Sequence, residues 1–174
     1  MKSRISSPPD AIRLFICRHA KSSWRNASLG DFDRPLNNRG ERDAPAMGYR
    51  LARQGIRPDL IMTSPAARAL ATALHYAHQL GIPPEQVRRN PAQYTASVPG
   101  LISLIRTVDS SVATLMLVGH NPESTGLANE LGGLHLDNIP TSGIVALAFP
   151  QCTWADLRAG CGTLLFFDYP KKQE

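Results

Sequence analysis

Residues 12–20 read IRLFICRHA, an apolar run that ends in the basic pair Arg18 and His19. A run of this length and character predicts a buried strand. A second apolar run, residues 115–118, also ends close to a histidine, His120. In open α/β sheets, ligands bind outside the carboxyl ends of the strands. The two runs therefore predict a single site to which each strand delivers an imidazole.

The remainder of the chain alternates between short apolar runs and segments with helical periodicity. We expect strands at residues 11–17, 59–63, 87–90, 112–118, 144–149 and 163–167. We expect helices at residues 39–54, 64–80, 98–108 and 122–131. Asn37 or Asn38 would cap the first helix, and Ser64 would cap the second. This alternation predicts an α/β fold with a mostly parallel sheet, whose last two strands pair antiparallel.

Length and composition indicate one globular domain, which we place at residues 11–170 of the 174, after a flexible polar tail at residues 1–10. No apolar stretch reaches the roughly 18 residues that cross a bilayer, and we expect no secretory signal. Three cysteines without C-x-x-C spacing favour a reducing cytoplasm. The net charge of +5 favours an anionic partner, but the basic residues are dispersed. We therefore expect no nucleic-acid partner and no membrane partner.

Four basic side chains are expected to meet at one edge of this sheet. Arg18 and His19 follow the first strand, Arg68 lies in the first turns of the helix after residues 59–63, and His120 follows a later buried strand. Guanidinium groups bind phosphate oxygens in a bidentate fashion, and helix N-termini add N–H donors. A histidine surrounded by arginines is kept unprotonated and can act as a nucleophile.

The segments that carry these residues resemble the histidine phosphatase superfamily, the phosphoglycerate mutase-like group. They are residues 14–20 (LFICRHA), 64–73 (SPAARALATA) and 118–122 (VGHNP). Residues 18–24 (RHAKSSW) and 31–40 (DFDRPLNNRG) are similar to its SixA-like phosphohistidine phosphatase branch. Ala20 stands where the family usually has glycine, which tolerates a positive φ better than alanine does.

The resemblance implies a fold and a mechanism. The fold would be a three-layer α/β/α sandwich of the phosphoglycerate mutase-like type. His19 would attack phosphorus, and Arg18, Arg68 and His120 would hold the phosphoryl oxygens, with a hydroxyl from Ser22 at the rim of the pocket. No metal and no cofactor are implied, because the arginines fill the charge role that a metal would otherwise take.

One departure from the family bears on the substrate. Many members carry an acidic residue between the second arginine and the second histidine, whereas residues 90–97 (NPAQYTAS) contain no carboxylate. An alkoxide leaving group needs a general acid, which contributes about 10²–10⁴-fold. An imidazole leaves more easily, so an acid-poor pocket favours cleavage of P–N over P–O bonds. Asp31, Asp33 and Glu123 are the candidates for a substitute acid.

The expected activity is therefore hydrolysis of a protein phosphohistidine, with a histidine phosphotransfer domain or a phosphotransferase carrier as the partner. A phosphatase or mutase acting on a small phosphate ester is a second hypothesis. A non-catalytic module that binds phosphohistidine is a third. Two further roles stay open: Arg34 can pair with Asp31 or Asp33 or can touch substrate, and Trp24 can cover the pocket or only pin its loop.

Overall fold

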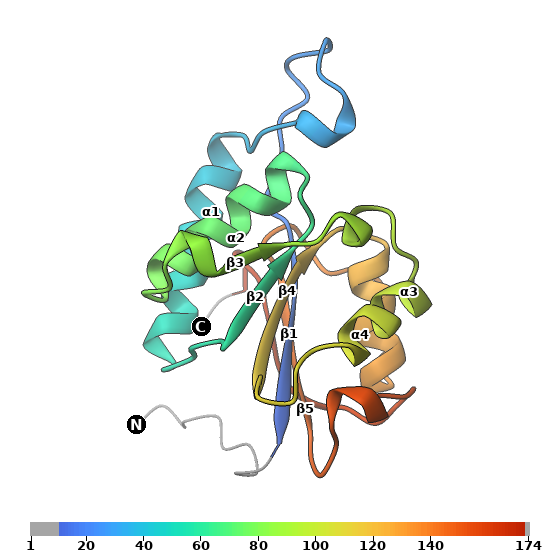
Figure 1. Ribbon diagram of the computed structural model, residues 1–174. Coiled ribbons are helices and arrows are strands. Elements are labelled where there is room, and N and C mark those ends of the chain that lie inside the picture. Colours follow the sequence, from blue (N-terminus) through green and yellow to red (C-terminus); the bar gives the residue numbers. More distant parts are fainter. Residues whose placement is uncertain (1–10, 173–174) are drawn as a thin grey trace.

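A computed structural model describes residues 11–172 of the chain (Figure 1). Six strands form one sheet in the order β3-β2-β4-β1-β5-β6. The first four strands of that order run parallel, whereas β5 runs antiparallel to both β1 and β6. The strands are β1 (Ile12–Arg18), β2 (Leu60–Thr63), β3 (Val87–Arg89), β4 (Thr114–Gly119), β5 (Ile144–Phe149) and β6 (Thr163–Asp168). The expected mostly parallel sheet with a late antiparallel pair is confirmed.

Helices cover both faces of the sheet and complete three layers (Figure 1). One face carries the pair α1 and α2, and the other carries α3 and α4. The four helices are α1 (Asn38–Arg53), α2 (Ala67–Gln79), α3 (Val98–Arg106) and α4 (Glu123–Gly132). Short 3-10 turns punctuate the connections: η1 (Asp31–Asp33), η2 (Pro84–Gln86), η3 (Pro91–Tyr94) and η4 (Trp154–Asp156).

The alternation of side chains along β1 explains why two cores are needed. Phe15 and Cys17 enter the core under α1 and α2, whereas Leu14 and Ile16 enter the core under α3 and α4. All four are almost fully buried. Successive residues of a strand point to opposite faces, so a continuous apolar run requires a cover on each side.

The two predicted helix caps have different outcomes. The side chain of Asn37 accepts a hydrogen bond from the Gly40 amide and caps α1, as one of the two expected alternatives. The expectation that Ser64 caps the second helix is wrong, because α2 begins at Ala67 without a side-chain cap. The Ser64 hydroxyl instead accepts from the Ala66 amide in a local turn.

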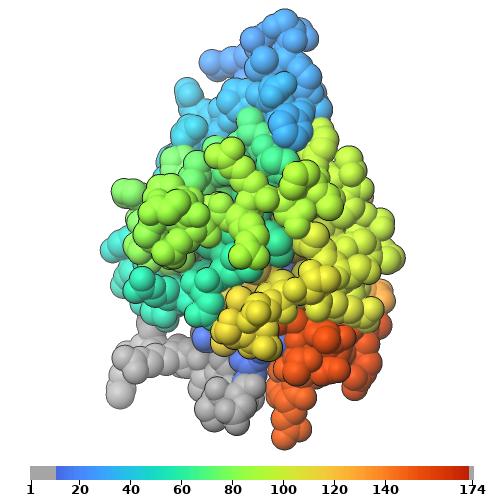
Figure 2. Space-filling view, viewed as in Figure 1, coloured from blue at the N-terminus to red at the C-terminus, as the bar shows by residue number. Residues whose placement is uncertain are grey.

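The long connection between β1 and α1 projects beyond the carboxyl edge of the sheet. It forms the blue apex of the molecule in both the ribbon and the space-filling views (Figures 1 and 2). The isolated bridge between Ser22 and Leu36 ties its two ends together, and η1 lies within it. The bridge therefore fixes where the connection leaves and rejoins the rest of the domain.

The tail expected at residues 1–10 lies outside the described residues. Within residues 11–172, none of the helices combines the length and the apolar character that crossing a bilayer demands.

Candidate active site

The register of β1 and β4 brings the two predicted histidines together. Arg18 lies opposite Gly119, so the residues that follow, His19 and His120, leave the sheet at the same point. The His19 amide donates to the Gly119 carbonyl at 2.9 Å. The two imidazole centroids lie 5.2 Å apart. The two strand ends therefore bring both imidazoles to one place.

The hydrogen bonds of His19 define which of its ring nitrogens carries the proton. Nδ1 lies 2.7 Å from the Ala20 carbonyl oxygen, which can only accept, so Nδ1 carries the proton. Nε2 of the neutral ring consequently keeps its lone pair. Burial lowers the pKa of His19 to about 3, and the neighbouring Arg68 and Arg18 act in the same direction. His19 is therefore neutral at physiological pH.

Arg68, the second residue of α2, faces that lone pair. Its Nε donates to His19 Nε2 at 3.3 Å, and its side chain is only 6% exposed. Thr72, one turn further along α2, donates to the Arg68 carbonyl and accepts from the Ala20 amide. This bridge ties the helix that carries Arg68 to the chain segment that carries His19. Ala20 is fully buried and is not among the described residues with a positive φ, so alanine fits here without strain.

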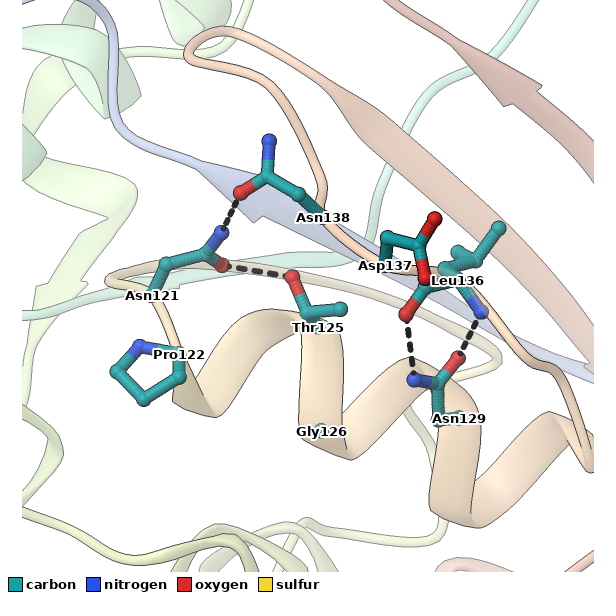
Figure 3. A pocket seen from close by; sticks show the side chains of 8 residues that line it. All are labelled: Asn121, Pro122, Thr125, Gly126, Asn129, Leu136, Asp137 and Asn138. Atoms are coloured by element: carbon teal, nitrogen blue, oxygen red, sulfur yellow. Dashed lines mark hydrogen bonds between the residues drawn. The ribbon is translucent and has the colours of Figure 1, made fainter.

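Arg18 reaches the opposite side of the site. Its Nη1 donates to the Ile139 carbonyl at 2.8 Å and to Asn138 Oδ1 at 3.2 Å. Asn121 Nδ2 donates to the same two acceptors, so an amide network buttresses the guanidinium. These amides form one wall of a surface pocket of about 430 Å³ beside α4 (Figure 3). Arg18 Nε is buried and has no hydrogen-bond partner among the described residues.

The hydroxyl of Ser64, which does not cap α2, orients His120. Its Nε2 lies 2.8 Å from Ser64 Oγ. When Ser64 donates this hydrogen bond, the ring proton resides on Nδ1, which is buried and unpaired within residues 11–172. Burial lowers the pKa of His120 to about 4, and Arg68 contributes to the shift.

The loop between β1 and α1 adds a carboxylate whose position the sequence did not reveal. Asp31 Oδ2 accepts from Arg68 Nη2 at 2.9 Å and from the Tyr94 hydroxyl at 2.9 Å. Its Oδ1 accepts from Arg34 Nε at 3.1 Å, which is the structural pairing that the sequence left as one alternative. Partial burial acts to raise the pKa of Asp31, but hydrogen bonds from Tyr94, Arg68 and Arg34 outweigh it and hold the pKa at about 2.

The remaining predicted residues lie at different distances from this centre. Ser22 is only 6% exposed and accepts from Arg34 Nη1 at 2.9 Å, so its hydroxyl is buried below Arg34 instead of lining the rim. Asp33 is exposed, and Glu123 begins α4; no hydrogen bond or ion pair of either carboxylate is present in the described part of the chain.

Two aromatic rings also contact residues of the site. The ring of Trp24 lies on the Arg34 guanidinium, and its centroid is 3.5 Å from the central guanidinium carbon. The ring of Tyr94 packs edge-on against His120, with 5.6 Å between the ring centroids, and no pattern near residue 94 shows this contact.

The charges of the site are unbalanced. Arg18, Arg34 and Arg68 oppose the single carboxylate of Asp31, while both imidazoles are neutral, which leaves a net positive charge. Such an arrangement can hold a small dianion and present the unprotonated His19 Nε2 to it. Within residues 11–172, His, Cys, Asp and Glu side chains do not gather in groups of three or more that could hold a metal ion.

Comparisons with known proteins identify the family of this chain. Residues 14–89 match the family model of the histidine phosphatase superfamily, branch 1. An uncharacterised protein of Mycobacterium tuberculosis is 33% identical over 164 residues, which cover 88% of this chain and 99% of the relative. A 2,3-bisphosphoglycerate-dependent phosphoglycerate mutase of Staphylococcus saprophyticus is 38% identical over 76 residues, or 41% of this chain and 33% of the mutase.

Solved structures show the same fold over almost the whole chain. A candidate phosphohistidine phosphatase SixA from Agrobacterium tumefaciens has a TM-score of 0.76 and 29% identity, and the match covers 91% of this chain and 98% of that one. The protein histidine phosphatase SixA complexed with tungstate has a TM-score of 0.77 at 23% identity, covering 91% and 97%. The expected phosphoglycerate mutase-like, SixA-like fold is confirmed, and the chain belongs to the histidine phosphatase superfamily.

Proposed function

We propose that this chain is a phosphohistidine phosphatase that works through a phosphorylated His19. The observation that carries the proposal is the state of His19. Its Nδ1 proton is held by the Ala20 carbonyl, while Nε2 keeps a lone pair beside the cationic Arg68. A neutral imidazole keeps the nitrogen lone pair that nucleophilic attack on a phosphoryl group needs, and the neighbouring guanidinium can bind the phosphoryl oxygens.

The reaction would proceed in two displacements at phosphorus. In the first, His19 Nε2 forms a bond to phosphorus while the bond to the substrate nitrogen breaks, and that nitrogen leaves with the electron pair. In the second, water attacks phosphorus, the bond to Nε2 breaks with its electron pair returning to the neutral His19 ring, and inorganic phosphate forms as the attacking water releases a proton to solvent. Arg18, Arg68 and His120 would stabilise the charge on the transferring oxygens. The buried, unpaired Arg18 Nε supports this role, and so does His120 Nδ1 when Ser64 donates to Nε2 and the ring proton resides on Nδ1, because unpaired buried donors are costly unless a ligand satisfies them.

The state of the carboxylates favours a nitrogen leaving group. Asp31 is ionised, since its pKa lies at about 2, and it therefore holds no proton to donate at neutral pH. Asp33 and Glu123 make no hydrogen bond to a site residue within the described part of the chain. An alkoxide would leave slowly without a general acid, whereas an imidazole leaves as a neutral ring once it is protonated. This argues for protein phosphohistidine over phosphoglycerate.

The proposed partner is a phosphorylated protein, either a histidine phosphotransfer domain or a phosphotransferase carrier. Support comes from the likeness to SixA structures, which are described as phosphohistidine phosphatases. We also place the protein in the cytoplasm, where its three free cysteines, Cys17, Cys152 and Cys161, would remain reduced. Neither a metal ion nor a cofactor enters the proposed reaction.

The test is phosphate release from a phosphorylated histidine phosphotransfer domain, measured beside p-nitrophenyl phosphate and 3-phosphoglycerate. The variants are His19→Ala and, as a matched control, His135→Ala, which removes an exposed histidine outside the site. We expect fast turnover of the phosphoprotein by wild type and by the control, little action on 3-phosphoglycerate, and no turnover by His19→Ala. Rapid-quench trapping should reveal an acid-labile phosphoryl group on His19.

Each alternative has its own signature in this experiment. Preferential turnover of a small ester would assign a general phosphomonoesterase and would make Asp31 the acid to examine first, because it is the carboxylate that touches the site. Tight binding of the phosphoprotein without turnover by wild type would assign a non-catalytic binding module.

A further inference from the structure

The carboxylate of Asp31 lies where two of the site's cations converge. Arg68 donates to it from Nη2 at 2.9 Å, and Arg34 forms an ion pair with its other oxygen at 3.0 Å. The two guanidinium groups are almost fully buried, whereas the carboxylate is 49% exposed. An incoming anion can therefore displace the exposed carboxylate more easily than it can move the two buried guanidinium groups.

Arg68 does not depend on this carboxylate for its position. Its Nη1 also donates to the main-chain carbonyl of Asp31 at 2.6 Å, and its Nε donates to His19. The main-chain contact would survive any substitution of the Asp31 side chain. The carboxylate therefore contributes negative charge to a position that the backbone already holds.

We propose that Asp31 is a specificity-determining counter-ion, which lowers the affinity of the site for free phosphate by neutralising part of the charge on Arg68 and Arg34. The inference rests on the proposed function, because it takes a phosphoryl dianion as the ligand. A phosphoryl group presented by a protein brings additional contacts and can outcompete the carboxylate. Free inorganic phosphate, which is also the product, has only its own charge and leaves readily.

The experiment is calorimetric titration of inorganic phosphate into the unliganded full-length protein, for wild type, Asp31→Asn and Asp33→Asn. Asparagine keeps an oxygen that can accept from Arg68 and Tyr94 but removes the charge. Asp33 lies two residues away, is exposed, and makes no side-chain contact with the site in residues 11–172, so Asp33→Asn changes the net charge equally. A parallel measurement is inhibition of turnover by inorganic phosphate.

We expect Asp31→Asn to lower the dissociation constant for phosphate by about tenfold, since a unit charge a few ångström away is removed from a partly shielded site. Product inhibition should strengthen by a similar factor, and Asp33→Asn should change both by less than about twofold. Asp31→Asn should therefore lower turnover at accumulated phosphate more than it lowers initial turnover.

Opposite or absent effects would overturn the inference. Weaker phosphate binding by Asp31→Asn, with unchanged thermal stability, would make Asp31 a residue that orients Arg68 for the ligand. Equal changes in both variants would show a nonspecific effect of net charge. Phosphate binding is measured without turnover, so a protein that binds phosphate as expected but hydrolyses no phosphohistidine would overturn the proposed function and leave this inference standing.

Discussion

Arg68 Nε donates to His19 Nε2 across 3.3 Å, so the atom expected to attack phosphorus is already paired with the cation expected to stabilise the transferred group. The pairing joins two segments that are 49 residues apart in the chain. It keeps the imidazole oriented and holds its proton on Nδ1, toward the Ala20 carbonyl. Nucleophile and cation are thus organised before any ligand arrives.

Arg68→Lys should damage this organisation even though it preserves the charge. A lysine donates from a single nitrogen and cannot bond His19 and Asp31 in the same planar geometry. We expect kcat/KM for the phosphoprotein to fall by about 10²–10³-fold, as for the loss of a transition-state donor elsewhere. The control is Arg88→Lys, at an exposed position of β3. A loss below about fivefold would contradict the role assigned to the guanidinium.

The stability of the protein should fall on acidification below about pH 6.5. The pKa values of His19 and His120 in the folded chain, about 3 and about 4, lie below their ordinary value of 6.5. The unfolded chain therefore takes up protons that the folded chain does not. Each histidine lowers the free energy of unfolding by up to about 1.4 kcal/mol per pH unit as pH falls from 6.5 toward its folded pKa.

Asp31 acts in the same direction at lower pH. In the folded chain the pKa of Asp31, about 2, lies below the ordinary 3.8. Its contribution to the free energy of unfolding is therefore present above pH 3.8 and is lost as pH falls toward 2. Urea unfolding at pH 7, 5.5 and 4.5 checks the histidine part. His19→Asn should reduce the pH dependence of the free energy of unfolding, whereas the control His135→Asn should leave that dependence as in wild type. If the free energy of unfolding of His19→Asn depends on pH as steeply as that of wild type, His19 is not a group whose pKa is lowered by folding.

Gly40→Ala should destabilise the junction between the active-site loop and α1. A Cβ at Gly40 would lie 2.2 Å from the Lys21 carbonyl oxygen, so backbone has to move. We expect Gly40→Ala to lower the free energy of unfolding by about 1–3 kcal/mol or more, as overpacking does at other positions. Gly30→Ala is the matched control, since Gly30 has a φ of −65° and no atom within 4 Å of the added Cβ. Urea denaturation of both variants makes the comparison, and equal stabilities would contradict the close approach.

Trp24→Ala should separate protein substrates from small ones. The indole is 72% exposed on the projecting loop, where it stacks on Arg34. An exposed tryptophan beside a site is well suited to bury against a protein partner, and such residues often dominate interfaces. We expect kcat/KM for the phosphoprotein to fall about tenfold or more, with little change for p-nitrophenyl phosphate.

The control for that prediction is Tyr49→Ala, which removes a 56% exposed aromatic from α1. Equal losses on both substrates would show that Trp24 acts through Arg34 on the chemistry itself. An unchanged kcat/KM for both substrates would show that Trp24 only packs within the loop and does not contact a protein substrate.

Much of the fold follows from local sequence because its signals are local. Apolar runs predicted the strands of the sheet, and their terminal residues predicted where Arg18, His19 and His120 would emerge. The wrong cap at Ser64 has a tertiary cause. Its hydroxyl lies beside His120, 56 residues away, and no pattern near residue 64 shows that contact.

The sequence by itself determined that an α/β sheet would carry two histidines and an arginine-rich segment to one edge, since strand periodicity and strand ends are written in consecutive residues. Only the tertiary structure decided how those groups are paired. The Asp31 carbonyl and carboxylate reach Arg68 across 37 residues, and Tyr94 reaches Asp31 across 63. Electrostatic partners are chosen by distance in space, so the path of the projecting loop, and not its composition, sets the charge and the protonation states of the site.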